Sequence, residues 1–382
     1  MVNGRNVLAI HAMNTSLGGS DLLVLPELTI NHTVSSQALL LDGAVTVTAR
    51  VRQGAKWSAA TQVEFVAGVP AASGENLVVS EIMYRPTPPT PEERAAGHDD
   101  RDLFEYIELL NISADEIALL GCRFTDGVDY GFDSGSPGLL GAGQRILIVR
   151  DRDAFAYRYG EQAALRVAGE FAEGTGLSND GESIAIEGVS GLIREFTYND
   201  KLPWPEAADG DGFSLTLDVA STAQPGDHQD PAAWRVSRFP GGSPGTDDGI
   251  VFSSWALASG LADDADWNRD ADGDGLSNFM EYALATNPQA PSVGRVPQVN
   301  RQQVDGGEQA GNYITFTFRR QIAAEDLTYS VEFSENLDTW NVITVFPYSI
   351  TLHDDGTRTE VWRMPFEVNM AGNYFVRLRV EG

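Results

Sequence analysis

The stretch 77-LVVSEIMY-84 decides the fold class, because it is short, rich in β-branched and aliphatic residues and bounded by turn-forming residues. Five more segments of this kind follow: 103-LFEYIELLN-111, 144-QRILIVR-150, 183-SIAIEG-188, 192-LIREFTY-198 and 213-FSLTLD-218. Clusters of Gly, Asp and Pro separate them, which predicts strands joined by turns. We therefore expect an all-β sandwich from Leu77 to about Asp248.

Two segments of this region do not fit a strand. One short helix is predicted over 152-RDAFAYRYG-160, where Gly160 ends it. The segment 85-RPTPPTPEERAAGHDDRD-102 is too rich in proline and charge to join a sheet, so we expect it to be an exposed loop.

The C-terminal region returns to a strand pattern. In 313-YITFTFRR-320, residues alternate between two faces with a period of two. Similar runs follow at 328-TYSVEF-333, 341-NVITVF-346, 357-TRTEVWRM-364 and 373-NYFVRLRV-380. These runs predict a second β-sandwich of about 70–90 residues.

The length of 382 residues predicts about two to four domains. Residues 6–66 contain several short strand-like runs, too few for a complete sandwich, and a segment rich in small residues follows them. We expect parts of two β modules at 1–31 and 32–68, a linker at 69–76, a sandwich at 77–248, a short helical segment at 249–292 and a second sandwich at 293–382. The predicted fold class is thus mainly β, with tandem sandwiches joined by the helical segment.

Charge and composition exclude several classes of partner. The chain has 55 Asp and Glu residues against 26 Lys and Arg, for a formal net charge of −29. Nucleic acids and anionic lipid surfaces would be repelled, and cations are the natural small partners. No apolar run approaches the length of about 20 residues that a membrane helix needs, so no membrane insertion is expected.

The ends of the chain and its one cysteine give further expectations. Residues 1–5 lead directly into the strand-like run 6-NVLAIHAMN-14 and lack the apolar core of a signal peptide. We therefore expect this chain to be the C-terminal part of a longer protein, with an export signal upstream of Met1. Cys122 has no partner for an internal disulfide, and we interpret it as a small buried hydrophobe.

The run 270-DADGDGLSNFME-281 matches the twelve-residue calcium loop at every ligand position. The predicted ligands are Asp270, Asp272, Asp274, the carbonyl oxygen of Leu276, Asn278 and Glu281. Alternate residues of such a loop point oxygens inward, and Gly275 permits the sharp turn. Without a cation these carboxylates would repel one another at short range. We predict calcium as the cofactor; the alternative is a solvated acidic turn.

The loop departs from a paired helix–loop–helix hand. Gly260 and 261-LADDADWNR-269 stand where the entering helix would be, and no second loop is present. Single loops of this kind occur in extracellular modules and bind calcium at roughly 10⁻⁴ to 10⁻³ M. The predicted role is to fix the hinge between two β domains.

No catalytic constellation is evident. The motif 241-GGSPG-245 fits G-x-S-x-G, but Pro244 has no N–H for an oxyanion hole. The five histidines, at positions 11, 32, 98, 228 and 353, are far apart, and we interpret each as a surface or turn residue. Glu105 and Glu108 fall on opposite faces of one strand and are interpreted as sheet-edge charges.

Two further features have open alternatives. The segment 203-PWPEAADGDGFSL-215, with Trp204 between prolines beside Asp209 and Asp211, is a carbohydrate platform, a weak second cation site, or a buried tryptophan that caps a tight Asp-Gly turn. Asn14, Asn31 and Asn111 each begin an N-x-S/T triplet and are permissible glycan acceptors.

A resemblance to a known family comes from motifs in the middle of the chain: 79-VSEIMYRP-86, 104-FEYIELLNIS-113, 119-LLGCRFTDGV-128, 176-GLSNDGESIAI-186, 198-YNDKLPWPEAADGDGFSL-215 and 234-WRVSRFPGGSPGT-246. Together they resemble the lamin tail domain, over close to half of the chain. The resemblance implies an immunoglobulin-like β-sandwich that serves as an interaction and attachment module. It adds no catalytic residue.

The flanks resemble pieces of large secreted bacterial proteins. Residues 6–28 are similar to the end of a galactose-binding-like jelly roll, and residues 45–65 to the end of a chitobiase-type module. Proteins that combine such pieces with a spore-coat (CotH-like) kinase domain have a similar layout, but no kinase segment is present here. The loop 270–281 with 282-YALATNP-288 also resembles the calcium segments of such proteins.

These observations predict a non-catalytic, extracellular or cell-surface attachment module with one structural calcium ion. Its partner is expected to be a cell-envelope protein or a glycan. Two alternatives remain: the accessory end of a secreted enzyme, a CotH-like kinase or a hydrolase, or a carbohydrate-binding module. The last requires Trp204 to be exposed.

Overall fold

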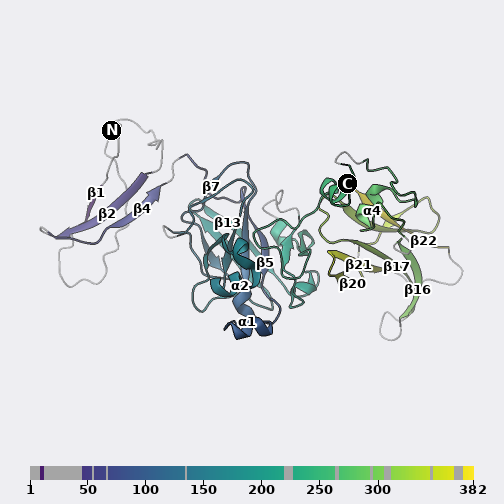
Figure 1. Cartoon of the computed structure of the whole chain (residues 1–382), viewed down its shortest axis with the longest axis horizontal. Coiled ribbons are helices and arrows are strands. Elements are labelled where there is room, and N and C mark those ends of the chain that lie inside the picture. Colours follow the sequence, from purple (N-terminus) through teal and green to yellow (C-terminus); the bar gives the residue numbers. More distant parts are fainter. Residues whose placement is uncertain are drawn as a thin grey trace.

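The computed structural model describes residues 9–12, 45–53, 56–65, 68–133, 136–218, 227–262, 266–292, 296–304, 311–344, 347–364 and 373–382. The chain is mainly β and forms several separate sheets (Figure 1). No helix among these residues is long and apolar enough to cross a membrane.

The N-terminal region forms one small sheet. Its strands are β1 (Ala9–Ala12), β2 (Val45–Gln53), β3 (Lys56–Trp57) and β4 (Thr61–Phe65). β2 pairs with β1 in parallel and with β3 and β4 in antiparallel orientation. Most of the predicted partial module 1–31, including Asn14, and the first part of 32–68 lie outside the described residues.

The middle region is built on a six-stranded sheet. In spatial order its strands are β11 (Val167–Glu170), β10 (Arg145–Val149), β6 (Tyr106–Asn111), β5 (Leu77–Met83), β14 (Leu215–Leu217) and β15 (Trp234–Val236). All neighbours are antiparallel except β10 and β11. The quoted stretch 77–84 forms β5, which is buried along its whole length in the interior of this sheet.

A second sheet packs against the first. It consists of β13 (Gly191–Tyr198), β12 (Glu182–Gly188) and β8 (Arg123–Asp126). One hydrophobic core contains Ile82 and Leu109 from the first sheet with Ile184 and Phe196 from the second. The short strands β7 (Ile117–Ala118) and β9 (Leu139–Leu140) pair beside this core. Cys122 is buried in it, as predicted.

The described part of the middle region contains two α-helices, one in the proline-rich segment that was expected to be a loop and one that runs four residues past its predicted end at Gly160. The loop 85–102 contains α1 (Pro91–Ala95), which starts with a Thr90–Glu93 capping box, and leads into the 3₁₀ turn η1 (Arg101–Phe104). Much of the loop is exposed as predicted, but Glu93 is buried because Arg158 binds both of its carboxylate oxygens. The other helix, α2 (Arg152–Ala164), runs past Gly160, which breaks the helical backbone with a φ of 85°. Further 3₁₀ turns are η2 (Glu206–Ala208), η4 (Asp227–Gln229) and η5 (Pro231–Ala233).

The C-terminal region contains two sheets and two short helices. One sheet has the order β16 (Gln298–Val304), β17 (Gly311–Gln321), β21 (Thr357–Arg363) and β20 (Ser349–His353). The other has the order β19 (Asn341–Val342), β18 (Thr328–Ser334) and β22 (Phe375–Glu381). Phe316 and Phe318 from the first sheet share a core with Val331 of the second. The helices α3 (Phe252–Ala258) and α4 (Asn278–Ala283) lie in the predicted helical segment.

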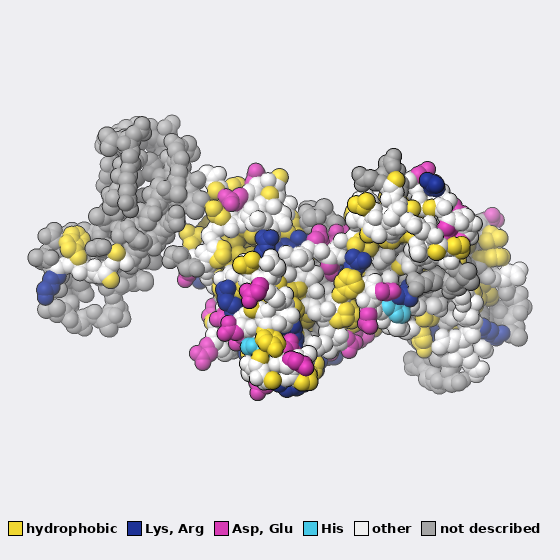
Figure 2. All heavy atoms as spheres, in the orientation of Figure 1, with side chains coloured by type: hydrophobic (Ala, Val, Ile, Leu, Met, Phe, Trp, Pro, Cys, Tyr) yellow, Lys and Arg dark blue, Asp and Glu magenta, His cyan; other side chains and the backbone are white. Residues whose placement is uncertain are grey.

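The middle and C-terminal regions contact each other directly. Phe213 and Val236 of the middle region form a buried cluster with Ile322, which follows β17. The backbone of Ile250 exchanges hydrogen bonds with Ala323 and Glu325, at 2.8 and 3.0 Å. Acidic side chains are spread over the visible face of both regions (Figure 2).

Candidate metal centre

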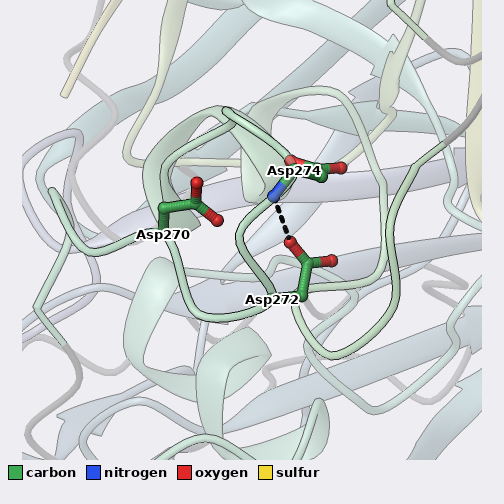
Figure 3. Close-up of side chains that lie close together, drawn as sticks. All are labelled: Asp270, Asp272 and Asp274. Atoms are coloured by element: carbon green, nitrogen blue, oxygen red, sulfur yellow. Dashed lines mark hydrogen bonds between the residues drawn. The ribbon is translucent and has the colours of Figure 1, made fainter.

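The acidic loop folds so that three carboxylates converge. One oxygen each of Asp270, Asp272 and Asp274 lies within 4.8 Å of the others. Figure 3 shows the three side chains around one turn of the loop, with the backbone N–H of Asp274 donating to Asp272. The turn depends on Gly275, whose φ of 97° is a conformation that other residues rarely adopt.

Backbone N–H groups fix the carboxylates in place. Gly273 and Gly275 donate to the two oxygens of Asp270, at 2.7 and 2.9 Å. The N–H of Leu276, which stands at loop position 7, donates to Asp274 at 2.8 Å. The hydrogen bonds from Gly275 and Gly273 lower the pKa of Asp270, so this carboxylate is held in its ionised form. The loop is thus ordered by its own backbone.

The two ligands predicted after the turn come from the start of α4. Ser277 caps this helix by accepting from the N–H of Met280, so Asn278 and Glu281 lie in the first turn. Both side chains are buried, although each belongs to a residue type that is usually exposed. Asn278 is held by a hydrogen bond from its Nδ2 to the carbonyl of Asp266.

Three oxygens at the ligand positions have no donor among the described residues. They are Oδ2 of Asp272, Oδ1 of Asn278 and Oε2 of Glu281, and all three are shielded from solvent. Burying an oxygen without a partner costs about 1–3 kcal/mol, and more when it is charged. Such atoms are rare in folded proteins, so three of them within one twelve-residue loop indicate that an electropositive group belongs there.

The electrostatics of Glu281 point the same way. Burial, together with the negative charges of Asp272 and Asp274, raises its pKa to about 7. A divalent cation would remove both effects, because it supplies the opposite charge and the missing coordination. Carboxylate, amide and carbonyl oxygens form the donor set that calcium prefers. The residues present therefore fit a calcium ion.

The loop is connected to the C-terminal β region and to Ile250, which closely follows the middle region. Tyr282 of α4 donates its hydroxyl to the carbonyl of Ile250 at 2.9 Å and to Asp326 at 2.6 Å. Tyr329 on β18 donates to the carbonyl of Ala283 at 2.9 Å. No helix runs into Asp270 in the described part of this segment, since α3 ends at Ala258, which agrees with the predicted departure from a paired hand.

Several other sequence interpretations were wrong. Glu105 and Glu108 are not sheet-edge charges, because β6 lies between β5 and β10 and both side chains are buried. His228 lies in the turn η4, as one of its two expected placements has it, but it is buried, and burial lowers its pKa to about 4, so its ring is neutral. Asn111 is buried and its Nδ2 donates to three carbonyl oxygens, so in the folded protein it is no glycan acceptor.

Trp204 is buried at 6% exposure and packs near Trp234, with ring centroids 6.0 Å apart. This confirms the turn-capping alternative and counts against Trp204 as a carbohydrate platform.

A second group of carboxylates was missed by sequence reasoning. Glu81 on β5 and Glu108 on β6 are buried and accept hydrogen bonds from the 241-GGSPG-245 motif. The N–H groups of Ser243 and Gly245 are therefore already used, which leaves the motif without oxyanion donors in addition to its Pro244. The one available signal was a pair of acidic residues inside otherwise apolar strands.

No protein-family model matches the chain, and no curated protein or solved structure matches it either.

Proposed function

We propose that this chain is a non-catalytic attachment or assembly module in which one calcium ion fastens the loop 270–281 between two β-sandwiches. The observation that carries the metal assignment is the set of buried oxygens without donors on Asp272, Asn278 and Glu281. A calcium ion satisfies all three at once, because it takes six to eight oxygen ligands.

The proposed architecture is a tandem of β-sandwiches with a lamin tail type domain in the middle. The support is the shared core between the two sheets of residues 77–248 and the motifs that resemble that family. A second shared core between the sheets of the C-terminal region supports the second sandwich. Attachment to a cell-envelope protein or a glycan, outside the cell, is the function that this family resemblance favours.

The ion would act on the joint between the two regions. Helix α4 supplies Asn278 and Glu281 as ligands and also supplies Tyr282, which is bonded to Ile250 and Asp326. Ordering of the loop by calcium would therefore order the contacts that hold Ile250, close to the end of the middle region, against the C-terminal region. An extracellular setting suits this role, because single loops of this kind bind too weakly to fill in cytosol.

Calorimetric titration with calcium tests the proposal. The wild-type protein should take up one ion, and the Asp270→Ala/Asp274→Ala variant should give no binding heat, since two ligands are gone. Asp99→Ala is the matched control, because it removes an exposed acidic side chain outside the loop. Equal heats for the wild-type protein and the double variant would rule out the site.

A further inference from the structure

Two buried glutamates face each other across neighbouring strands of the middle sheet. Glu81 on β5 and Glu108 on β6 are direct partners in the strand register, and each is only 1% exposed. Directly opposite residues in a sheet have Cβ atoms about 4.5–5.5 Å apart. Two carboxylates are therefore buried side by side, where like charges repel strongly.

Neutral donors surround Glu81. Its Oε1 accepts from the hydroxyls of Tyr106 at 2.6 Å and Ser214 at 2.5 Å and from the N–H of Ser243 at 2.8 Å. Its Oε2 accepts from the Ser243 hydroxyl at 3.0 Å. Among the described residues no cationic side chain forms an ion pair with this carboxylate, so its charge has no direct cationic partner there.

Glu108 is bound differently. Its Oε1 accepts from the Ser80 hydroxyl at 2.6 Å and contacts Nε of Arg145 at 3.1 Å. Its Oε2 accepts from the N–H of Gly245 at 2.7 Å. One guanidinium therefore lies beside two carboxylates. If both carboxylates were ionised, the group would have a net negative charge.

The loop 241–246 covers the pair. Gly242 has a φ of 77°, and a Cβ added there would overlap both the Tyr106 hydroxyl and the Glu81 carboxylate. Ser243 is bonded to Glu81 and Gly245 to Glu108, so each glutamate holds one part of the loop. On its outer side the loop forms one wall of a cleft, and the other wall is α2 with Gln162 and Leu165.

Other charged and titratable groups border the pair on every side. They are Tyr106 on β6, Arg145 on β10, Tyr159 and Arg166 beside α2, Arg235 on β15, Asp247 and Asp248 after the loop, and Glu325 of the C-terminal region. Arg235 is bound to Asp248 at 2.5 Å and Arg145 also contacts Asp247 at 3.4 Å, so both cations are shared with further acids. The surrounding groups therefore do not neutralise the excess negative charge of the Glu81–Glu108 pair.

We propose that the Glu81–Glu108 pair carries one proton while the loop 241–246 is closed over it, and that loss of this proton to solvent lifts the loop from the sheet. Of the segments that shield the two glutamates from solvent, the loop 241–246 is not paired in a sheet. Moving this loop therefore costs the least free energy when water must reach two charged carboxylates. We call the pair and the loop 241–246 a latch, which is closed at acidic pH. When the latch opens, the loop moves and the wall that it forms in the cleft beside α2 changes.

The pKa values support the direction of this switch. Burial and the charge of Glu81 raise the pKa of Glu108 to about 8, although Arg145 opposes the rise. Burial also raises the pKa of Glu81. A carboxyl whose pKa is raised on folding stabilises the closed state below its unfolded value and loses this contribution as the pH rises toward its folded value. The latch should therefore close on the acid side and open in mildly alkaline solution.

Hydrogen exchange of the wild-type protein in excess calcium tests the latch. The protection factors of the Ser243 and Gly245 amides should fall by up to about tenfold for each pH unit as the pH rises from the ordinary carboxyl pKa toward the raised pKa of the closed pair, and should level off above it. The amide of Ile107, inside the same sheet, should keep its protection. If the Ser243 and Gly245 protection factors do not change between about pH 6 and pH 9, the latch does not exist.

Two neutral variants sharpen the test. Glu108→Gln fixes the pair with at most one charge, so the protection of the loop amides should no longer depend on pH. Glu105→Gln is the control, because Glu105 directly precedes the same strand, has a pKa raised by burial to about 8 and binds the N–H of Leu177 instead of the loop. A pH-dependent loop in Glu108→Gln, or a pH-independent one in Glu105→Gln, would overturn the proposal. Should Glu108→Gln not fold, Glu81→Gln replaces it with the same expectations.

Discussion

Carboxylates lie close together both in the acidic loop 270–281 and in the buried pair of Glu81 and Glu108. The two groups differ in the partners that bind their oxygens. At the pair, hydroxyl, N–H and guanidinium groups of the chain bind the carboxylate oxygens. At the loop, oxygens of Asp272, Asn278 and Glu281 are buried with no donor among the described residues. The first group is satisfied within the fold, whereas the second leaves buried oxygens that a bound cation could satisfy.

The comparison also separates two roles for backbone N–H groups. In the acidic loop they bind both oxygens of Asp270 and of Asp274 but only one oxygen of Asp272, whose Oδ2 is left without a donor. At the glutamate pair they belong to a distant segment, and they join it to the sheet. Nearby carboxylates thus indicate a metal site only when the remaining oxygens lack donors.

The largest effect that this comparison predicts is the loss of Glu81. Glu81→Ala removes the acceptor for Tyr106, Ser214 and Ser243 and leaves their donors buried without partners. The free energy of unfolding should fall by about 3–5 kcal/mol. Urea unfolding measures it, with Glu187→Ala on β12 as the control for an exposed glutamate. A loss below about 1 kcal/mol would mean that the network is not a structural unit.

Sequence reasoning identified the acidic loop because its ligand spacing is local. Twelve consecutive residues contain every predicted ligand, and the glycine at position 6 fixes the turn. The glutamate pair depends instead on strand order and register, since Glu81 meets Ser214 and Ser243 over 133 and 162 residues of chain. Alternation within a strand predicts which face a residue occupies, not whether that strand is central or at an edge.

The fold shows the same limit. The strands β5, β6, β10, β12, β13 and β14 lie where their apolar segments predict them. Helix α1 was missed because prolines suggested a loop, although Pro91 stands at the first helical position, which tolerates proline. β16 was missed because its sequence, QVNRQQV, is mostly polar, and it forms by pairing with β17 along seven residues.

A smaller effect is expected at the acidic loop. Calcium at about ten times its dissociation constant should stabilise the wild-type protein by about 1.4 kcal/mol, because it binds only the folded loop. Thermal unfolding with calcium and with a chelator measures the difference. Asp272→Asn should lose most of this gain, and Glu108→Gln should retain it, since Glu108 is not a ligand. Stabilisation of Asp272→Asn equal to that of the wild-type protein would place the ion elsewhere.

Glu281→Gln should have effects of opposite sign with and without the ion. At pH 8 and without calcium, it removes a buried charge whose pKa is raised by burial and by Asp272 and Asp274. The metal-free protein should therefore gain about 1 kcal/mol. With calcium the variant should bind more weakly than the wild-type protein, because the bidentate ligand at position 12 is lost. If the variant is less stable than the wild-type protein in chelator, charge repulsion around Glu281 does not destabilise the metal-free protein.

The smallest effect concerns a carboxylate that water can reach. Arg123 and Glu187 form an ion pair at 3.0 Å between β8 and β12, and their side chains are 66% and 42% exposed. Arg123→Ala should change the free energy of unfolding by no more than about 0.5 kcal/mol, because water solvates the remaining glutamate. Arg145→Ala is the matched comparison: it leaves Glu108 buried beside Glu81 without its guanidinium and should cost several times more. Equal losses for the two arginines, measured by urea unfolding at one pH, would show that Glu108 is already neutral without Arg145. In that case the proton of the pair resides on Glu108, and Glu81 is the charged partner that its hydroxyl and N–H donors stabilise.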